Sequence, residues 1–246
     1  MGAPKAALEW HGSTLLRRTA GVLARSAGGP VVVVRAVGQA LPDLPPSATV
    51  TEDPRPDRGP LQGIAAGLAS AAHEGADVAF VTSVDLPFLH PAFVRRVLAL
   101  LGDAEIALPV ARGHRQPLAA AYRTSLAAPA ERLVAAGNLK PATLFSERIV
   151  ATLAVPELLG DPRLARLDPD LDSLVNVNTP EEYRQARTRP APLVTVRSGG
   201  AEHTVRAATL GAAGAGLAWR SAVVEGALAS DPLFPLVTGD TIEFTF

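Results

Sequence analysis

The sequence of 246 residues contains no cysteine. This absence excludes disulfide bonds, zinc sites built from thiolates, and a cysteine nucleophile. The five histidines lack the spacing of a metal site, so each is expected on the surface or in a loop. They are His11, His73, His90, His114 and His203.

An excess of one charge sign is also lacking. The chain has 23 Lys and Arg against 24 Asp and Glu, a formal net charge of -1. Proteins that bind nucleic acid or an anionic membrane through their overall field carry a strongly basic surface, so neither partner is expected. No stretch approaches the roughly 18 apolar residues of a membrane span, and no apolar signal core stands at the N-terminus. The expected location is therefore the cytoplasm, and any anionic ligand must be held by a local site.

Lysine is scarce, because only Lys5 and Lys140 interrupt an otherwise all-arginine set of cations. A lysine kept in such a chain can serve as a compact charge on a flexible stem, although chance in a biased composition is an alternative. Lys5 follows a Gly-Ala-Pro turn of the sort that lies between a buried strand and a helix. Next to a glycine-rich turn, a lysine can neutralise a polyphosphate.

Apolar strands alternate with helical patterns along most of the chain. The runs "GGPVVVVRAV" and "ADVAFVTSVD" are typical of buried parallel strands, and helices are predicted at 13–27, 59–75 and 91–102. Further strands are predicted at "EIALPVA", "QPLAAAYR" and "LVNVN", with helices at "TSLAAPAERLVAAG" and "TPEEYRQAR". This order predicts an α/β fold, a Rossmann-like sheet with helices on both faces.

The composition changes at "TRPAP", which we interpret as a linker at 188–192 between a domain of residues 1–187 and a tail of residues 193–246. In the tail, "LVTVRSGGAEHTVRAATL" predicts a hairpin that turns at Gly199 and Gly200, and the chain ends in "PLFPLVTGDTIEFTF". A β-rich module of this size is marginal alone. It is therefore expected to dock on the larger domain or on another subunit.

Asp85 directly follows a buried strand. This places it at the carboxyl edge of the sheet, where open α/β sheets bind ligands. A carboxylate followed by Leu-Pro can present itself to Mg²⁺ bound to nucleotide phosphates. A plain turn or cap is the alternative.

The segment "TEDPRPDRGPLQG" combines aspartates with two glycines at a predicted helix start. Gly59 and Gly63 permit close approach of a ligand to the backbone, and Asp53 or Asp57 can accept hydrogen bonds from a base or a ribose. Alternatively, Asp57 is a helix N-cap and Pro60 stands in the first turn. That alternative does not account for Gly63, because glycine costs a helix about 1 kcal/mol.

In "DSLVNVNTPEE", Asn176 and Asn178 are two positions apart, so on a strand both amides project from one face. Both can then address a single ligand. Alternatively, Asn178 caps the helix that begins at Thr179 and Pro180, which leaves only Asn176 for function.

Taken in order, these segments resemble the molybdenum cofactor guanylyltransferases, the MobA-like branch of the nucleotidyltransferase fold. The resemblance covers about residues 1–186 and rests on "MGAPKAALEWHGSTLLRR", "GPLQGIAAGL", "VDLPFLHPAFV", "QPLAAAYR" and "VNVNTPEEY". It implies that Lys5 contacts the nucleotide phosphates and that Asp85 binds Mg²⁺, the expected cofactor. These two residues are the expected catalytic groups.

The resemblance also implies two substrate pockets. The guanine nucleotide pocket is expected at Asp53, Gly59, Pro60, Leu61 and Gly63. Acceptor-binding residues are expected at Arg115, Gln116, Tyr122, Asn176 and Asn178. The implied substrates are GTP and molybdopterin, and a molybdoenzyme or its chaperone is an implied protein partner.

The implied reaction is attack by the terminal phosphate of molybdopterin on the α-phosphorus of GTP, with release of pyrophosphate. Such a transfer needs no protein nucleophile. Its catalysis is mainly alignment and charge neutralisation, which suits one lysine, one aspartate with Mg²⁺, and backbone amides.

Family members begin with a strand that ends in Leu-Ala-Gly-Gly, whereas Met1 of this chain falls on a methionine inside the first family motif. We expect the natural start to lie upstream. In the chain as written, we expect a slot in the core, fewer backbone donors for phosphate, and weak or absent transferase activity.

The tail resembles the final strands of the β-grasp sulfur carriers, in particular the small subunit of molybdopterin synthase. Those carriers end in Gly-Gly, whereas this chain ends at Phe246. The tail is therefore expected to be a vestigial or docking module that carries no sulfur.

Two other functions stay open on the sequence. One is a nucleotidyltransferase for another base or acceptor, such as the cytidylyl form of the same cofactor. The other is a protein without catalytic activity that holds the cofactor or a molybdoenzyme.

Overall fold

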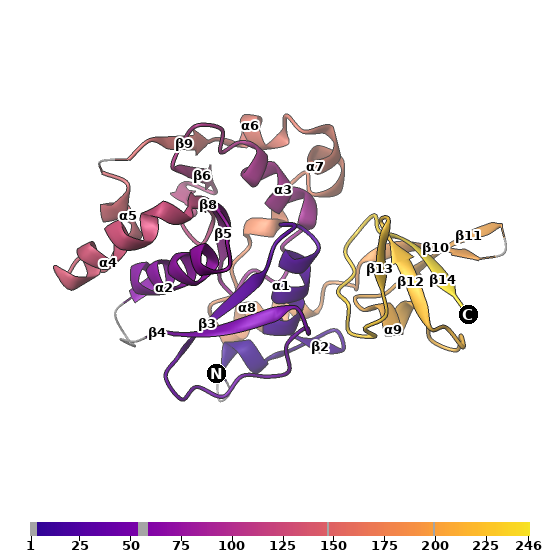
Figure 1. Cartoon of the computed structure of the whole chain (residues 1–246). Helices are drawn as coiled ribbons and strands as arrows, with labels where there is room; N and C mark the ends of the chain where they lie inside the picture. The colour runs from indigo at the N-terminus through magenta and orange to yellow at the C-terminus, as the bar shows by residue number, and fades with distance from the viewer. Residues whose placement is uncertain (1–3, 54–58, 147, 199) are drawn as a thin grey trace.

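The structure is a computed structural model that describes residues 4–53, 59–146, 148–198 and 200–246. Two predicted positions, the possible helix cap Asp57 and the hairpin residue Gly199, lie outside these ranges. The described chain forms a larger N-terminal part, called here the main domain, and a smaller C-terminal module of residues 193–246 (Figure 1).

The first described segment leads into helix α1. It holds the short helix η1 (Lys5–Ala7) and the two-residue strands β1 (Glu9–Trp10) and β2 (Ser13–Thr14), which pair antiparallel. Helix α1 (Leu15–Ala24) starts where the Thr14 side chain accepts a hydrogen bond from the backbone N–H of Arg17. This threonine cap satisfies one of the free N–H groups of the first turn.

The central sheet has the order β5-β8-β6-β7, and β9 pairs with β6. Its strands are β5 (Val78–Thr82), β6 (Ile106–Ala111), β7 (His114–Arg115), β8 (Ala119–Arg123) and β9 (Val150–Leu153). Strand β8 is antiparallel to both β5 and β6, so the sheet is mixed, although the continuous apolar runs predict a parallel one. The reason is local: β6 and β7 form a hairpin, and β8 follows it in the returning direction.

Helices cover both faces of this sheet, as predicted. Helices α1 and α3 (Pro91–Ala99) contact each other, as do α2 (Gly59–His73) and α4 (Ala127–Ala135). Alternate residues of β8 face the two helix layers, because Ala119 and Ala121 pack in the core cluster of α3 and Ala120 and Tyr122 in that of α2 and α4. The remaining elements are α5 (Pro141–Leu144), α6 (Val155–Leu159), α7 (Pro162–Leu167), α8 (Pro180–Arg187), η2 (Thr124–Leu126) and η3 (Asp172–Leu174).

A separate parallel pair, β3 (Val31–Ala36) and β4 (Ala48–Asp53), lies beside this sheet. Strand β4 was not predicted, because four of the six residues of "ATVTED" are polar and each of the six is exposed or half-buried. Within the described residues, β3 pairs only with β4, and β5 pairs only with β8. The two strands therefore present unpaired backbone edges.

An apolar cavity of about 400 Å³ lies between β3 and β5. It is lined by residues 31–34 of β3 and 78–82 of β5, and helices α1 and α2 complete its walls. Among the wall residues are Leu16, Ala20, Leu23, Gly63, Ile64 and Gly67. A slot in the core is what the family resemblance leads us to expect, and this cavity has that character.

Because the cavity is apolar, filling it from α1 is expected to stabilise the protein. We predict that Ala20→Leu raises the free energy of unfolding by about 1 kcal/mol, measured by urea denaturation. Ala20 is buried and lines the cavity. The matched control is Ala130→Leu, at a fully buried alanine of α4 in close-packed core, which should cost about 1–3 kcal/mol. Destabilisation of similar size by both substitutions would show that the cavity does not accept side chains.

The C-terminal module contains a five-stranded sheet of order β11-β10-β14-β12-β13 with one short helix, α9 (Leu210–Ala213). The strands are β10 (Leu193–Ser198), β11 (Ala201–Arg206), β12 (Ser221–Val224), β13 (Ala227–Ala229) and β14 (Thr241–Thr245). Strands β10 and β14 are parallel, and the other pairs are antiparallel. The module has its own apolar cluster around Val196, Leu210 and Ile242. It is β-rich as predicted, and its likeness to the sulfur carriers stays a prediction.

The module packs on α1 of the main domain. Arg25 donates two hydrogen bonds of 2.7 Å to the carboxylate of Asp240, and both side chains are buried. At Gly21 a side chain would meet the Pro235 ring, because a Cβ there would lie 2.6 Å from Pro235 Cδ. The buried ion pair and this close approach fix the module against the helix that follows the Lys5 segment.

Candidate functional site

Three predicted residues from distant parts of the chain meet at one place. Lys5 Nζ donates a hydrogen bond of 3.1 Å to Asn178 Oδ1 and lies 3.8 Å from Asp85 Oδ2. The Lys5 and Asp85 side chains keep 32% and 20% of their surface exposed. A cation, a carboxylate and an amide oxygen are therefore held together within reach of a ligand from solvent.

The loop after β5 holds Asp85 in place. The Asp85 carbonyl accepts a hydrogen bond of 2.9 Å from Val177 N–H, which ties this loop to the segment of Asn178. The Ser83 hydroxyl donates to Asp85 Oδ1. Ser83 was not predicted, and its position two residues before Asp85 was the available signal. Because Ser83 takes one carboxylate oxygen, the other faces Lys5.

Asn178 is not the cap of α8, so that alternative is wrong. The N-cap is Thr179, whose side chain accepts from Glu182 N–H, while the Glu182 carboxylate accepts from the backbone of Thr179 and Asn178. The N–H groups of Asn178 and Thr179 lower the pKa of Glu182. This capping box leaves the Asn178 side chain free for Lys5.

The predicted strand at 174–178 is not formed, because Leu174 ends η3 and the other residues belong to no described strand. The segment still alternates: Val177 is buried beside Trp10, whereas Asn176 and Asn178 are exposed. Of these two asparagines, only Asn178 is hydrogen-bonded to Lys5 within the described residues. Asn176 therefore stays a predicted acceptor residue without a contact to the other two.

Two of the predicted nucleotide-binding residues at the start of α2, Gly59 and Leu61, have structural roles. Gly59 has φ of +70°, and a Cβ there would lie 3.1 Å from the Leu139 carbonyl oxygen, so glycine is required by the backbone. Leu61 is fully buried in the core, so only its backbone remains available to a nucleotide. Gly63 differs, because a Cβ there would meet no atom within 4 Å. Gly63 and Pro60 both line the cavity between β3 and β5.

Asp53 is the last residue of β4, opposite Ala36 of β3. It is half-buried at the carboxyl end of this parallel pair. Asp85 likewise follows the carboxyl end of β5. Both candidate carboxylates thus come at the strand ends where α/β sheets bind ligands, and the nucleotide role of Asp53 stays a prediction.

The predicted acceptor residues on β7, directly after it and on β8 differ in whether their side chains can be reached by a ligand. Tyr122 is fully buried, and its hydroxyl donates a hydrogen bond of 2.8 Å to the Pro117 carbonyl. Burial raises its pKa. Tyr122 is therefore a core residue, and its predicted contact with the acceptor is wrong. Arg115 is exposed on β7, and Gln116 Nε2 donates to the Ala111 carbonyl at 3.3 Å.

A magnesium ion would need oxygen ligands here. No group of three or more His, Cys, Asp or Glu that could hold a metal occurs in the part of the chain that the structure describes. Mg²⁺ bound to nucleotides commonly uses one or two carboxylates together with phosphate oxygens and water. Asp85, which comes with a hydroxyl and an amide oxygen nearby, has donor chemistry that fits such an ion.

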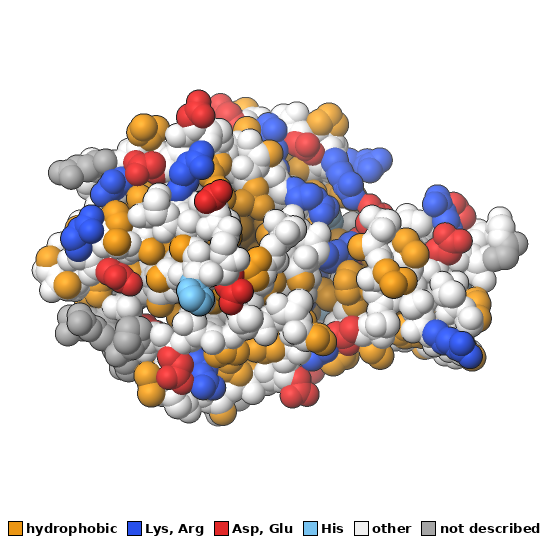
Figure 2. Space-filling model, in the orientation of Figure 1, with side chains coloured by type: hydrophobic (Ala, Val, Ile, Leu, Met, Phe, Trp, Pro, Cys, Tyr) orange, Lys and Arg blue, Asp and Glu red, His pale blue; other side chains and the backbone are white. Residues whose placement is uncertain are grey.

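The surface carries no field of one sign on the face shown in Figure 2, where Lys and Arg side chains are interspersed with Asp and Glu. In the described residues, none of the helices has the length and apolar character to cross a bilayer. Any binding of anions must therefore come from local groups such as Lys5.

His90 connects the loop after Asp85 to the C-terminal module. Its Nδ1 accepts from Ala92 N–H at 3.0 Å and caps α3, and its Nε2 lies 3.1 Å from the Thr238 carbonyl oxygen. These partners fit a neutral ring that carries its proton on Nε2. Burial lowers the pKa of His90.

We predict that this histidine makes folding stability fall in mild acid. In the unfolded chain His90 takes up a proton near pH 6.5, whereas in the folded chain protonation of the buried ring is disfavoured. The contribution of His90 to folding stability is therefore full above about pH 6.5 and declines as the pH falls below that value. Thermal unfolding between pH 7.5 and 5 measures this. In His90→Asn, which keeps a capping side chain, the acid slope should be smaller. An unchanged slope would remove His90 as its source.

Comparison with known proteins assigns a family. Residues 1–152 match the family described as MobA-like NTP transferase domain. A protein of Mycobacterium tuberculosis (strain ATCC 25618 / H37Rv) named "Probable molybdenum cofactor guanylyltransferase" is 40% identical over 148 residues, which are 58% of this chain and 72% of that protein. A protein of the same name from Mycobacterium avium (strain 104) is 37% identical over 161 residues, 64% of this chain and 80% of that protein.

Two solved structures share the fold. Molybdopterin-guanine dinucleotide biosynthesis protein A from Archaeoglobus fulgidus aligns with a TM-score of 0.57 at 21% identity, over 76% of this chain and 90% of that one. The 2-C-methyl-D-erythritol 4-phosphate cytidylyltransferase from Thermus thermophilus aligns with a TM-score of 0.53 at 21% identity, over 76% and 93%. At this identity the likeness shows the fold alone, and it confirms the predicted nucleotidyltransferase architecture.

Proposed function

The chain belongs to the MobA-like NTP transferase domain family, and from this premise we propose that it transfers GMP from GTP to the terminal phosphate of molybdopterin with the help of Mg²⁺. The family assignment makes the chain a nucleotidyltransferase. The relatives at 37–40% identity that are named for molybdenum cofactor guanylyl transfer support this acceptor and this base. The observation that carries the proposal is the meeting of Lys5, Asp85 and Asn178.

In the proposed reaction, an oxygen of the molybdopterin phosphate attacks the α-phosphorus of GTP. A new P–O bond forms to the acceptor, and the bond between the α-phosphorus and its bridging oxygen breaks, so pyrophosphate leaves. No side chain becomes covalently attached. The protein has to align two phosphates and offset the repulsion between them.

Each of the three residues has a separate part in this alignment. Lys5 neutralises charge on the triphosphate, and the Asn178 amide oxygen holds its ammonium group in place. Asp85 would hold Mg²⁺, which supplies further neutralisation of the phosphates when bound. Ser83, which donates to the other oxygen of Asp85, orients that carboxylate.

The remaining predicted residues are assigned to the substrates. Asp53, Pro60 and the backbone of the α2 start are proposed for the guanine nucleotide. Asn176, Arg115 and Gln116 are proposed for the acceptor. Tyr122 and the Leu61 side chain are left out, because both are buried in the core.

The test is pyrophosphate release with Mg²⁺, molybdopterin and either GTP or CTP. It is run on the chain and on a form with an apolar strand added ahead of Met1, because the cavity between β3 and β5 leaves two strand edges unpaired. We expect release with GTP, faster in the extended form. Release with CTP alone would move the activity to the cytidylyl class, and release by neither form would overturn the enzymatic function.

A further inference from the structure

A second cavity, of about 390 Å³, lies where the main domain meets the C-terminal module. We call it the seam cleft. Its main-domain wall includes Trp10, His11, Arg18, Phe88, residues 167–170 and Asp172. Its other wall includes residues 189–193, Arg206, Val237 and Thr238. The proposed transfer reaction uses none of these residues.

Arg18 is the unusual member of this lining. Only 6% of it is exposed. Its Nε donates to the Pro87 carbonyl at 2.9 Å, and its Nη1 donates to the Leu236 carbonyl at 3.1 Å. Across the described ranges, no carboxylate forms an ion pair with Arg18, and its Nη2 makes no hydrogen bond. A largely buried guanidinium with no carboxylate in direct contact is costly, so an anion at the remaining donor would be stabilising.

Two neighbouring arginines, Arg17 in α1 and Arg25 directly after it, show the contrast. Arg17 pairs with Asp231 at 2.6 Å, and Arg25 occupies both oxygens of Asp240. Asp240 lies close enough to favour the charge of Arg18, yet its oxygens are taken by Arg25. Burial outweighs this help and lowers the pKa of Arg18 to about 10. Arg18 stays charged at neutral pH, and its unused donor belongs to a side chain that lines the seam cleft.

Two of the three aspartates along the cleft form hydrogen bonds or ion pairs with groups other than Arg18. Asp168 accepts hydrogen bonds from the backbone of Asp172 and Ser173. Asp172 pairs with Arg112 and Arg189. Asp170 is exposed at the rim. None of the three offers a counter-charge to Arg18.

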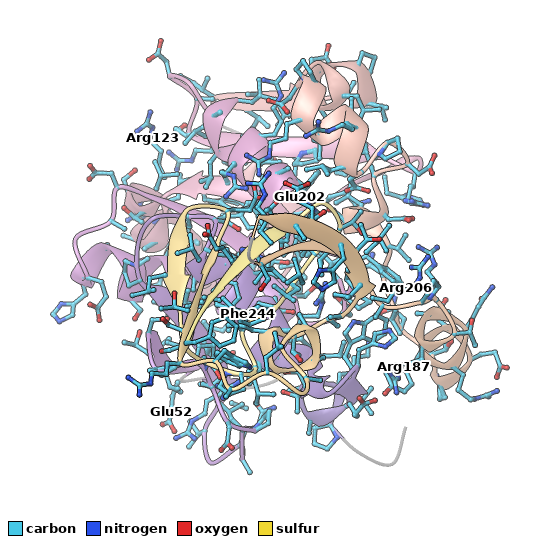
Figure 3. The ribbon with its side chains drawn as sticks, turned by 90° about the vertical axis from the view of Figure 1, so that its right-hand side faces the viewer. Glu52, Arg123, Arg187, Glu202, Arg206 and Phe244 are labelled. Atoms are coloured by element: carbon cyan, nitrogen blue, oxygen red, sulfur yellow. The ribbon has the colours of Figure 1, made fainter. Side chains whose placement is uncertain are left out.

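Other basic residues lie in and near the cleft. Arg206, the last residue of β11, donates to the Ala191 carbonyl on the same wall at 3.1 Å. In Figure 3 it lies on the same side of the molecule as Arg187 of α8. Burial lowers the pKa of His11, and the charges of Arg187 and Arg18 act in the same direction, against that of Glu9.

We propose that the seam cleft binds the oxyanion of a small molecule, a phosphate or carboxylate group, with Arg18 Nη2 as the central donor and Arg206 at the rim. The anion supplies the directly paired counter-charge that Arg18 lacks. Charge-assisted hydrogen bonds in such a sheltered place are strong. The ligand would also join the module to the main domain, because Arg18 already contacts the loop at Pro87 and the module at Leu236.

The test is calorimetric titration of the whole chain with inorganic phosphate and, separately, with acetate. The titration uses the Lys5→Met background, so that phosphate binding at the Lys5 site does not contribute. We expect saturable binding of at least one anion, and the stronger of the two identifies the ligand class. Arg18→Met should weaken it by at least about tenfold. The matched control Arg17→Met, at the adjacent interface arginine, should leave it unchanged.

Two further measurements test the proposal even if the Arg18→Met variant does not fold. Arg206→Gln, at an exposed rim residue, should weaken anion binding by about threefold to tenfold. The Arg18 Nε resonance should shift in an NMR titration with the anion. If neither anion binds saturably, or if binding occurs without any effect of Arg18 or Arg206, the seam cleft is not an oxyanion site.

Discussion

Asp85→Asn is expected to lower transferase turnover by about a thousandfold. The substitution keeps the size of the side chain and an oxygen that can accept from the Ser83 hydroxyl, but it removes the charge that would hold Mg²⁺. The Asp85 carbonyl would still accept from Val177 N–H. The fold should therefore be retained, and circular dichroism and thermal unfolding should match the unmodified chain.

A control substitution at the other end of strand β5 separates this effect from a general loss of negative charge. Asp77 precedes β5, at the opposite end from Asp85, and is exposed. Asp77→Asn should leave turnover within about twofold, because surface substitutions away from special features have small effects. Undiminished turnover in Asp85→Asn, or an equal loss in both variants, would remove Asp85 from the metal role.

Lys5→Met is expected to lower turnover by about a hundredfold to a thousandfold. Methionine approximates the length of the lysine stem and removes the ammonium group that faces Asp85 and Asn178. Stability should change little, because a partly exposed pair at 3.8 Å contributes less than about 1 kcal/mol. Initial rates at saturating GTP measure the effect.

The chain offers one natural control for this lysine. Lys140 is the only other lysine in the sequence and lies exposed before α5. Lys140→Met should leave turnover unchanged. Equal losses in Lys5→Met and Lys140→Met would indicate that positive charge in general, and not the place of Lys5, supports the reaction.

Much of the main domain could be predicted from apolar runs. The β-branched stretch at 31–34 and the run at 78–81 predicted β3 and β5, because continuous apolar sequence marks strands that are buried on both faces. Such runs do not reveal strand direction. The antiparallel β8 follows from the hairpin of β6 and β7, which is a matter of connection. Strand β4 escaped prediction because most of its residues are polar and apolar residues do not alternate with them along the whole strand.

The candidate site could be predicted in part. Lys5, Asp85 and Asn178 were chosen from separate segments, and the fold brings them together. Tyr122 was misplaced because both faces of β8 are buried, so its alternation does not separate core from pocket. The cap of α8 was readable: Thr179 is followed three residues later by Glu182, which is the spacing of a capping box.

The seam cleft was beyond prediction for a different reason. Arg18 looks like any arginine of an amphipathic helix, and its isolation depends on Asp231 and Asp240, more than 200 positions away, being taken by Arg17 and Arg25. Only the packed structure shows which of three close arginines lacks a carboxylate. The role of Gly21 was also beyond prediction, because only the packed structure shows that a side chain there would collide with Pro235.

The most direct test of the central claim follows the α-phosphate itself. GTP labelled in its α-phosphorus is incubated with Mg²⁺ and molybdopterin, using the chain, its strand-extended form and the Asp85→Asn variant of each. The account predicts that label appears in the molybdopterin product with one equivalent of pyrophosphate, and that Asp85→Asn slows the appearance of both by about a thousandfold. Label that never enters the acceptor, or that enters it equally well without the Asp85 carboxylate, would contradict the account.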